Sequence, residues 1–130
     1  MQLLTLDQHL RYEHESLGRY PRDADGAIEW SAVADELVLS STDSDSIEQS
    51  TIIQQFTPKA SSLIFFWGSL AVPSVEMGIE SSLSHLPDIA EFAPELWIYS
   101  PGDHIVVELS FSGVVTAAHV PAKTDGRNPA

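Results

Sequence analysis

Residues 61–74 read SSLIFFWGSLAVPS, and five consecutive large apolar residues stand at the centre of this stretch: Leu63, Ile64, Phe65, Phe66 and Trp67. A strand with one face in solvent alternates apolar and polar residues, whereas a strand covered on both faces is apolar throughout. Serine residues precede the run and Gly68 follows it, as turn residues do at the ends of a short strand. The stretch therefore predicts a central strand over residues 62–68 that is packed on both faces, in preference to a ligand-binding aromatic cluster.

The residues after this strand predict a helix and a second strand. Apolar residues recur at helical spacing over residues 73–87, where Pro73 suits the first turn and Pro87 the end: Val75, Ile79, Leu83 and Leu86. Residues 96–100, LWIYS, form a second apolar run of strand length. Strand, helix and strand in this order indicate a right-handed βαβ unit if the two strands are neighbours.

The C-terminal sequence HIVVELSFSGVVTAAHV, residues 104–120, predicts a β-hairpin with a two-residue turn at Ser112-Gly113. This turn sets a register in which four pairs share one buried face: Phe111–Val114, Leu109–Thr116, Val107–Ala118 and Ile105–Val120. Glu108 and His119 then lie diagonally on the outer face, within reach of a hydrogen bond. The remaining residues, 122–130, are predicted to be disordered.

Three helices are predicted before the central strand. Thr5 begins the first, over residues 5–18, because Gln8 completes a capping box, and its apolar stripe contains Leu6, Leu10 and Leu17. Residues 27–41 carry apolar side chains at helical spacing (Trp30, Val33, Ala34, Leu37 and Val38) and acidic ones on the other side (Glu29, Asp35 and Glu36). A third, short helix is capped by Asp45 or Ser46 and ends at Pro58.

Together these elements predict one α+β domain over residues 1–121. The N-terminal helices and a crossover helix pack on a mixed sheet of about four strands, which ends in the C-terminal hairpin. A chain of 130 residues is long enough to form a single domain with its own core. No apolar run reaches the length of roughly 18 residues that a membrane-spanning helix requires, and the N-terminus lacks the features of a signal peptide. We therefore expect a soluble, cytoplasmic protein.

Charge is the most unusual property of the sequence. The chain has 19 acidic and 6 basic residues, which gives a formal net charge of −13. No Lys or Arg occurs between Arg22 and Lys59, nor between Lys59 and Lys123, and these two intervals contain 15 of the acidic residues. A surface of this kind repels nucleic acids and anionic membranes and attracts basic partners. Solubility alone is the other explanation for such a composition.

Motifs for catalysis or metal binding are not found in the sequence. The chain has no cysteine, and His9 and His14 are five residues apart, where two ligands on a helix need a spacing of three or four. Ser69 follows a predicted strand but lacks the glycines of a nucleophile elbow. We therefore expect no metal and no cofactor. The candidate acid–base pair is Glu108 with His119 on the predicted hairpin.

Residues 63–120 resemble the immunity proteins of bacterial polymorphic toxin systems, and among them the CdiI-type proteins of contact-dependent growth inhibition. The similarity lies in FFWGSLAVPS (65–74), LWIYSP (96–101) and SGVVT (112–116), and it spans a little under half of the chain. The resemblance implies a small cytoplasmic protein without catalytic activity. Such a protein neutralises one cognate toxin domain, often a nuclease, by blocking its active site or substrate path.

The charge pattern fits this role, because a toxin that holds RNA or DNA needs a basic cleft. From charge and expected exposure, five residues are the candidates for contact with the toxin: Asp43, Asp45, Glu48, Glu76 and Glu80. Two other functions remain open. One alternative is a small acid–base enzyme that uses Glu108 and His119. The other is an acidic structural subunit whose exposed aromatic residues are buried in an oligomer.

Overall fold

The computed structural model describes residues 2–24, 28–43, 46–67, 74–92, 95–110 and 113–121. Its strands are β1 (Gln2–Leu3), β2 (Val38–Asp43), β3 (Ser62–Trp67), β4 (Val75–Gly78), β5 (Leu96–Ser100), β6 (Ile105–Leu109) and β7 (Val114–His119). Its helices are α1 (Leu6–Glu15), α2 (Ser46–Phe56) and α3 (Ile79–Phe92), and its short 3₁₀ turns are η1 (Leu17–Arg19), η2 (Trp30–Ala32) and η3 (Asp35–Leu37). None of the described helices is long and apolar enough to cross a membrane.

The described strands form one seven-stranded sheet in the order β1-β4-β3-β5-β6-β7-β2, and every neighbouring pair is antiparallel. This confirms an α+β fold, whereas the prediction of about four strands was too low and the prediction of a mixed sheet was wrong. The βαβ unit is also wrong. The chain reverses at β4 before it enters α3, so β5 returns antiparallel to β3 on its other side.

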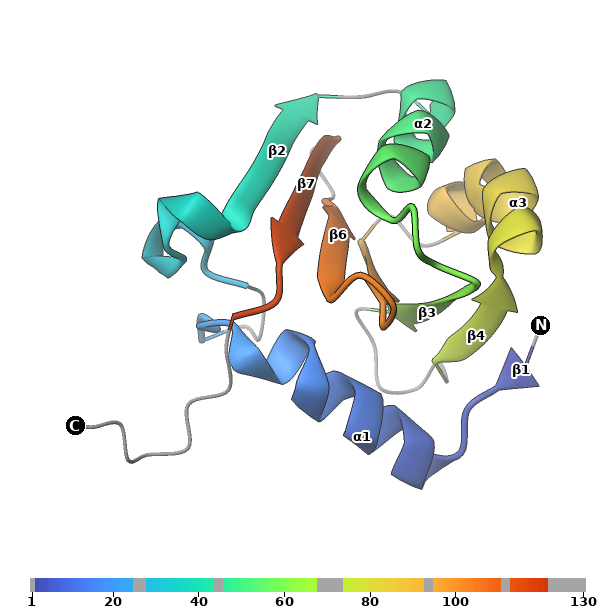
Figure 1. The fold of residues 1–130 in the computed structure, drawn as a ribbon, viewed down its shortest axis with the longest axis horizontal. Coiled ribbons are helices and arrows are strands. Elements are labelled where there is room, and N and C mark those ends of the chain that lie inside the picture. The colour runs from blue at the N-terminus through green and yellow to red at the C-terminus, as the bar shows by residue number, and fades with distance from the viewer. Residues whose placement is uncertain are drawn as a thin grey trace.

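Helices cover both faces of this sheet (Figure 1): α2 and α3 lie on one face, and α1 lies on the other. Side chains of β3 alternate between the two layers. Leu63 and Phe65 enter the cluster under α2 and α3, whereas Ile64 and Phe66 enter the cluster that includes residues of α1 and η1. All four are at most 2% exposed. The central strand covered on both faces is therefore confirmed over Ser62–Trp67.

Two of the predicted N-terminal helices are present. In α1 the Thr5 hydroxyl accepts the backbone N–H of Gln8, and the Gln8 side chain accepts the backbone N–H of Thr5, which completes the predicted capping box. The third predicted helix is α2, which begins at Ser46 and ends at Phe56, before Pro58. Its alternative cap, Asp45, lies outside the described residues, as do Ser69 and the predicted tail over 122–130.

The apolar stripe predicted for α1 does not face the sheet. Leu6 and Leu10 are 72% and 50% exposed, and of the three leucines only Leu17, in η1, is buried. The helix instead turns His9 and Tyr12 toward aromatic residues of β3 and β5, with ring centroids 5.6 and 6.5 Å apart in edge-to-face arrangements. Aromatic contacts of this geometry replace the expected leucine packing.

The helix predicted over residues 27–41 is wrong. The chain forms the 3₁₀ turns η2 and η3 there and continues as strand β2, which pairs with β7. The buried residues Ile28 and Val33 do face the core, but two short turns present them rather than one helix. Tertiary pairing with β7 overrides the weak helical preference of this segment, because helix propensity is only a small energetic term.

The helix predicted over residues 73–87 is displaced. Residues 75–78 form strand β4, in which the buried Val75 and Met77 alternate with Glu76 and Gly78. This period of two is that of a strand. The helix α3 starts only at Ile79 and continues past residue 87 to residue 92. Glu76 therefore lies in a strand and Glu80 in a helix, whereas the prediction places both in one helix over residues 73–87.

The C-terminal hairpin is present, but its register differs by one residue from the prediction. Leu109 pairs with Val115, and Glu108 pairs with Thr116. The reason lies in the closing pair of the turn: the Ser110 N–H donates to the Val114 carbonyl, and Gly113, directly before Val114, has a φ of 92°. Three-residue hairpin loops commonly place glycine in this left-handed conformation. A shift by one residue reverses the face of every side chain in one strand relative to the other.

This register contradicts the proposed acid–base pair. Glu108 shares its face of the sheet with its partner Thr116, whereas His119 pairs with Ile105 and is exposed. Because side chains alternate along β7, His119 lies on the opposite face from Thr116 and Glu108. The structure therefore contradicts the acid–base pair on which the enzyme hypothesis rests.

Candidate functional site

Strand β2 forms one edge of the sheet, since it pairs only with β7 among the described strands. The register of this pair shifts between Val38 and Ser40, which marks an irregularity of the bulge type. Leu39 lies at this point and is 38% exposed, and Ser41 and Thr42 are also exposed. An edge strand presents unpaired backbone groups on its outer side, and these can bind an extended segment of another protein.

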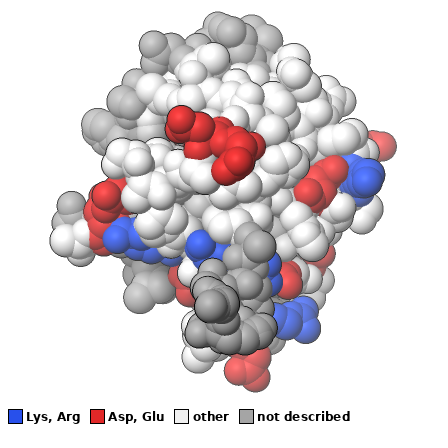
Figure 2. All heavy atoms as spheres, turned by 60° about the vertical axis from the view of Figure 1, so that its left-hand side comes forward, with Lys and Arg blue, Asp and Glu red and all other residues white. Residues whose placement is uncertain are grey.

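Acidic residues cluster in sequence around this edge strand. Asp35 and Glu36 belong to η3, immediately before β2, and Glu29 precedes η2; all three side chains are exposed. We call β2 together with these three residues the acidic edge. Figure 2 brings this side of the molecule forward and shows a compact group of carboxylates with uncharged surface around it. Long-range attraction of a basic partner is strongest where carboxylates are not neutralised locally.

The five predicted contact residues do not form one patch. Asp43 is the last residue of β2 and Glu48 lies near the start of α2, whereas Asp45 is outside the described residues. Glu76 lies in β4, where it is half-buried and accepts a hydrogen bond from the Ser62 hydroxyl. Strands β4 and β2 are five positions apart in the sheet, or about 24 Å at the usual strand spacing.

Glu80 is exposed in the first turn of α3 and follows β4, so it belongs with Glu76 rather than with Asp43. The sequence analysis named Asp43, at the end of β2, but not Glu29, Asp35 and Glu36, whose exposed side chains precede this strand in the chain. The sequence predicts a helix for this segment, with the three carboxylates on the side opposite its apolar residues. The interval without any basic residue between Arg22 and Lys59 was the available signal.

A buried carboxylate holds the start of the acidic edge in place. Glu108 is 7% exposed, and its two oxygens accept hydrogen bonds from the indole N–H groups of Trp30, at 2.7 Å, and Trp97, at 2.8 Å. Trp30 begins η2, and Trp97 lies in β5 next to β6. The carboxylate therefore ties the segment that carries Glu29, Asp35 and Glu36 to the centre of the sheet.

Burial raises the pKa of the Glu108 carboxyl above its usual value, although the indole N–H groups act in the opposite direction by stabilising the ionised form. A carboxyl with a higher pKa in the folded state binds protons more readily when folded. Its contribution to the free energy of unfolding is therefore fully present below pH 4.5, the ordinary pKa of a glutamic acid side chain. That contribution is lost as the pH rises through the raised folded pKa.

We accordingly expect the Glu108→Gln variant to lose this part of the pH dependence. Urea denaturation between pH 4 and pH 7.5 measures the free energy of unfolding of both proteins. The free energy of unfolding of the wild type, relative to that of the variant, should fall as the pH increases. Glu29→Gln, an exposed carboxylate next to Trp30, is the matched control and should keep the wild-type dependence. A difference that stays constant over this range contradicts the assignment.

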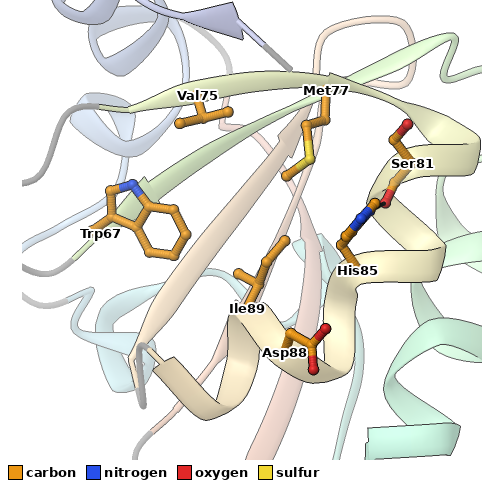
Figure 3. A pocket seen from close by; sticks show the side chains of 7 residues that line it. All are labelled: Trp67, Val75, Met77, Ser81, His85, Asp88 and Ile89. Carbon is orange, nitrogen blue, oxygen red and sulfur yellow. Dashed lines mark hydrogen bonds between the residues drawn. The ribbon is translucent and has the colours of Figure 1, made fainter.

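A pocket of about 390 Å³ lies between α3 and the neighbouring strands β3 and β4 (Figure 3), on the face of the sheet opposite α1. Its apolar walls come from Trp67 at the end of β3, Val75 and Met77 in β4, and Ile89 in α3. Its polar side consists of Ser81, His85 and Asp88, all from α3. This volume falls in the range of small-molecule sites in proteins, about 300–1,000 Å³.

No protein-family model matches this chain, and no curated protein matches it in sequence. The similarity of residues 63–120 to CdiI-type immunity proteins thus rests only on the residues quoted for it. Several of these are core residues, such as Phe65 and Phe66 of β3 and Leu96 of β5. A functional conclusion therefore has to come from the exposed surface and its charge.

Proposed function

We propose that this chain is an immunity protein that binds a cognate basic toxin domain, of nuclease type, and blocks its active site or substrate path. The observation that supports this proposal most strongly is the acidic edge, with exposed carboxylates beside an edge strand and no basic residue from 23 to 58. A nuclease binds phosphates through Lys and Arg. A carboxylate surface can occupy the same basic cleft.

The two parts of the acidic edge have separate tasks in this proposal. The carboxylates accelerate the encounter with a basic partner and orient it. Affinity comes from a few groups that become buried: the exposed Leu39 and the outer backbone of β2, a strand of six residues and about 20 Å in length. The hydrogen bonds of Glu108 keep η2 fixed to the sheet, so little ordering has to accompany binding.

The partner in this proposal is a protein, and the place of action is the cytoplasm of the cell that makes both molecules. The direct experiment first asks whether the neighbouring gene encodes a large secreted protein that ends in a small basic domain, and then co-expresses that domain with this chain. We expect cells to survive only when this chain is present, and the two proteins to co-purify as a complex. Survival without complex formation, or death despite full expression, contradicts the proposal.

A further inference from the structure

We propose that the pocket between α3 and strands β3 and β4 binds a small organic cation, an ammonium or guanidinium group carried on an apolar or aromatic body. This inference goes beyond the immunity function and does not depend on it. The pocket lies near β3 and β4, and β3 is four strand positions from the acidic edge at β2. Both sites can therefore be occupied at the same time.

The floor and one wall of the pocket suit an apolar body. Val75 and Met77 are each 5% exposed, and their strand is held between β1 and β3. The Trp67 ring stacks on Phe65 with a centroid distance of 6.4 Å and an interplanar angle of 28°, which fixes its orientation. In Figure 3 the Trp67 ring borders the cavity opposite the polar residues of α3. An aromatic wall also attracts a cation through its ring face.

The polar side of the pocket is rich in hydrogen-bond acceptors. The His85 Nδ1 atom lies 2.9 Å from the backbone carbonyl of Ser81, and a carbonyl can only accept. The hydrogen of the neutral ring therefore sits on Nδ1, and Nε2 is left as an acceptor. Asp88, three residues further along the helix, adds an exposed carboxylate. Residues with spacings of three and four share one face of a helix.

Charge decides which ligand fits this arrangement. The described lining contains one carboxylate, Asp88, and neither Lys nor Arg. A ligand that donates hydrogen bonds and carries positive charge satisfies these acceptors, whereas an anion meets a carboxylate without any compensating base. The size of the pocket, about 390 Å³, admits an aromatic ring with a short amine chain.

The test uses the folded full chain and three probes of nearly equal shape: 2-phenylethylamine, 2-phenylethanol and phenylacetate. The chain contains three tryptophans, so its ¹H–¹⁵N spectrum resolves three indole signals. The Trp67 signal should shift and saturate with the amine. The signals of Trp30 and Trp97 serve as internal controls, because their N–H groups bind Glu108 on the other face of the sheet. The alcohol should bind about 3- to 5-fold more weakly, as an exposed ion pair contributes up to about 1 kcal/mol, and phenylacetate more weakly still.

Two single variants separate the pocket from the general charge of the protein. Asp88→Asn should lower the affinity for the amine about 3- to 5-fold and leave the affinity for the alcohol unchanged. Glu80→Gln removes one exposed carboxylate from the same helix, outside the pocket lining, and should leave both affinities unchanged. Equal weakening by both variants, an anion that binds as well as the amine, or shifts of all three indole signals together would each overturn the proposal. None of these results bears on toxin binding, which co-expression tests separately.

Discussion

Exchange of Asp35 and Glu36 for lysine should slow association with the proposed basic toxin domain at least about tenfold at low salt. Both residues are exposed in η3, immediately before the edge strand β2. Each exchange changes the charge by +2, so the formal net charge moves from −13 to −9. The new lysines repel the basic cleft at the place where the partner is expected to dock, and stopped-flow fluorescence measures the rate constant.

A second double variant with the same net charge separates location from total charge. Asp7 in α1 and Glu80 in α3 are exposed. They follow β1 and β4, which lie at the opposite side of the sheet from β2. Their exchange for lysine also gives −9 and should reduce the rate constant much less. If the rate constant of this second variant falls as much as that of the first, or more, the contact surface is not the acidic edge. Glu80, which the sequence analysis proposed, would then regain its candidacy.

Truncation of either phenylalanine of the central strand should destabilise the protein by about 3–5 kcal/mol. Phe65 packs under α2 and α3, and Phe66 packs on the side of α1; they are 0% and 2% exposed. Phe65→Ala and Phe66→Ala therefore each remove a large side chain from a separate layer. Urea denaturation of the two variants without any partner gives the free energy of unfolding.

The comparison of the two variants tests whether both faces of the sheet are truly covered. Phe56→Ala in α2 is the control, because Phe56 is only partly buried against the same core. This variant should lose less free energy of unfolding than the other two. Comparable losses for Phe65 and Phe66 are expected. If one of the two costs less than about 1 kcal/mol, its face is open to solvent and the aromatic run serves another purpose.

The sequence was most informative where burial is complete. A strand packed on both faces leaves a continuous apolar run, so β3 and β5 could be located to within a residue. The capping box at Thr5 fixed the start of α1 in the same way, since the signal is local. Signals of this kind depend on adjacent residues and do not require knowledge of the fold.

The errors arose where tertiary pairing decided the structure. Val75 and Ile79 are spaced as on a helix, yet Val75 belongs to β4 and Ile79 begins α3. Segment 27–41 shows a helical period but forms two turns and the strand β2. In the hairpin, β6 and residues 115–118 of β7 are buried on both faces. No solvent-exposed face was left to set the register, and the turn that Ser110 and Val114 close shifted it.

The candidate sites were visible from the sequence only in part. The charge imbalance was plain, but its placement beside an edge strand requires the order of the sheet. The pocket required even more, because Ser81, His85 and Asp88 share a helix that sequence reasoning ended at Pro87. Trp67 and Met77 join them only through the pairing of β3 with β4. Sites built from several elements are difficult to find before the fold is known.

The salt dependence of the association rate constant tests the central claim most directly. The full chain is mixed with the purified toxin domain at ionic strengths from about 20 mM to 500 mM, a range over which screening becomes severe. We expect the rate constant of the wild type to fall steeply with salt. The Asp35→Lys, Glu36→Lys variant should depend on salt far less. A wild-type rate constant that is unchanged across this range would contradict recognition through the acidic edge.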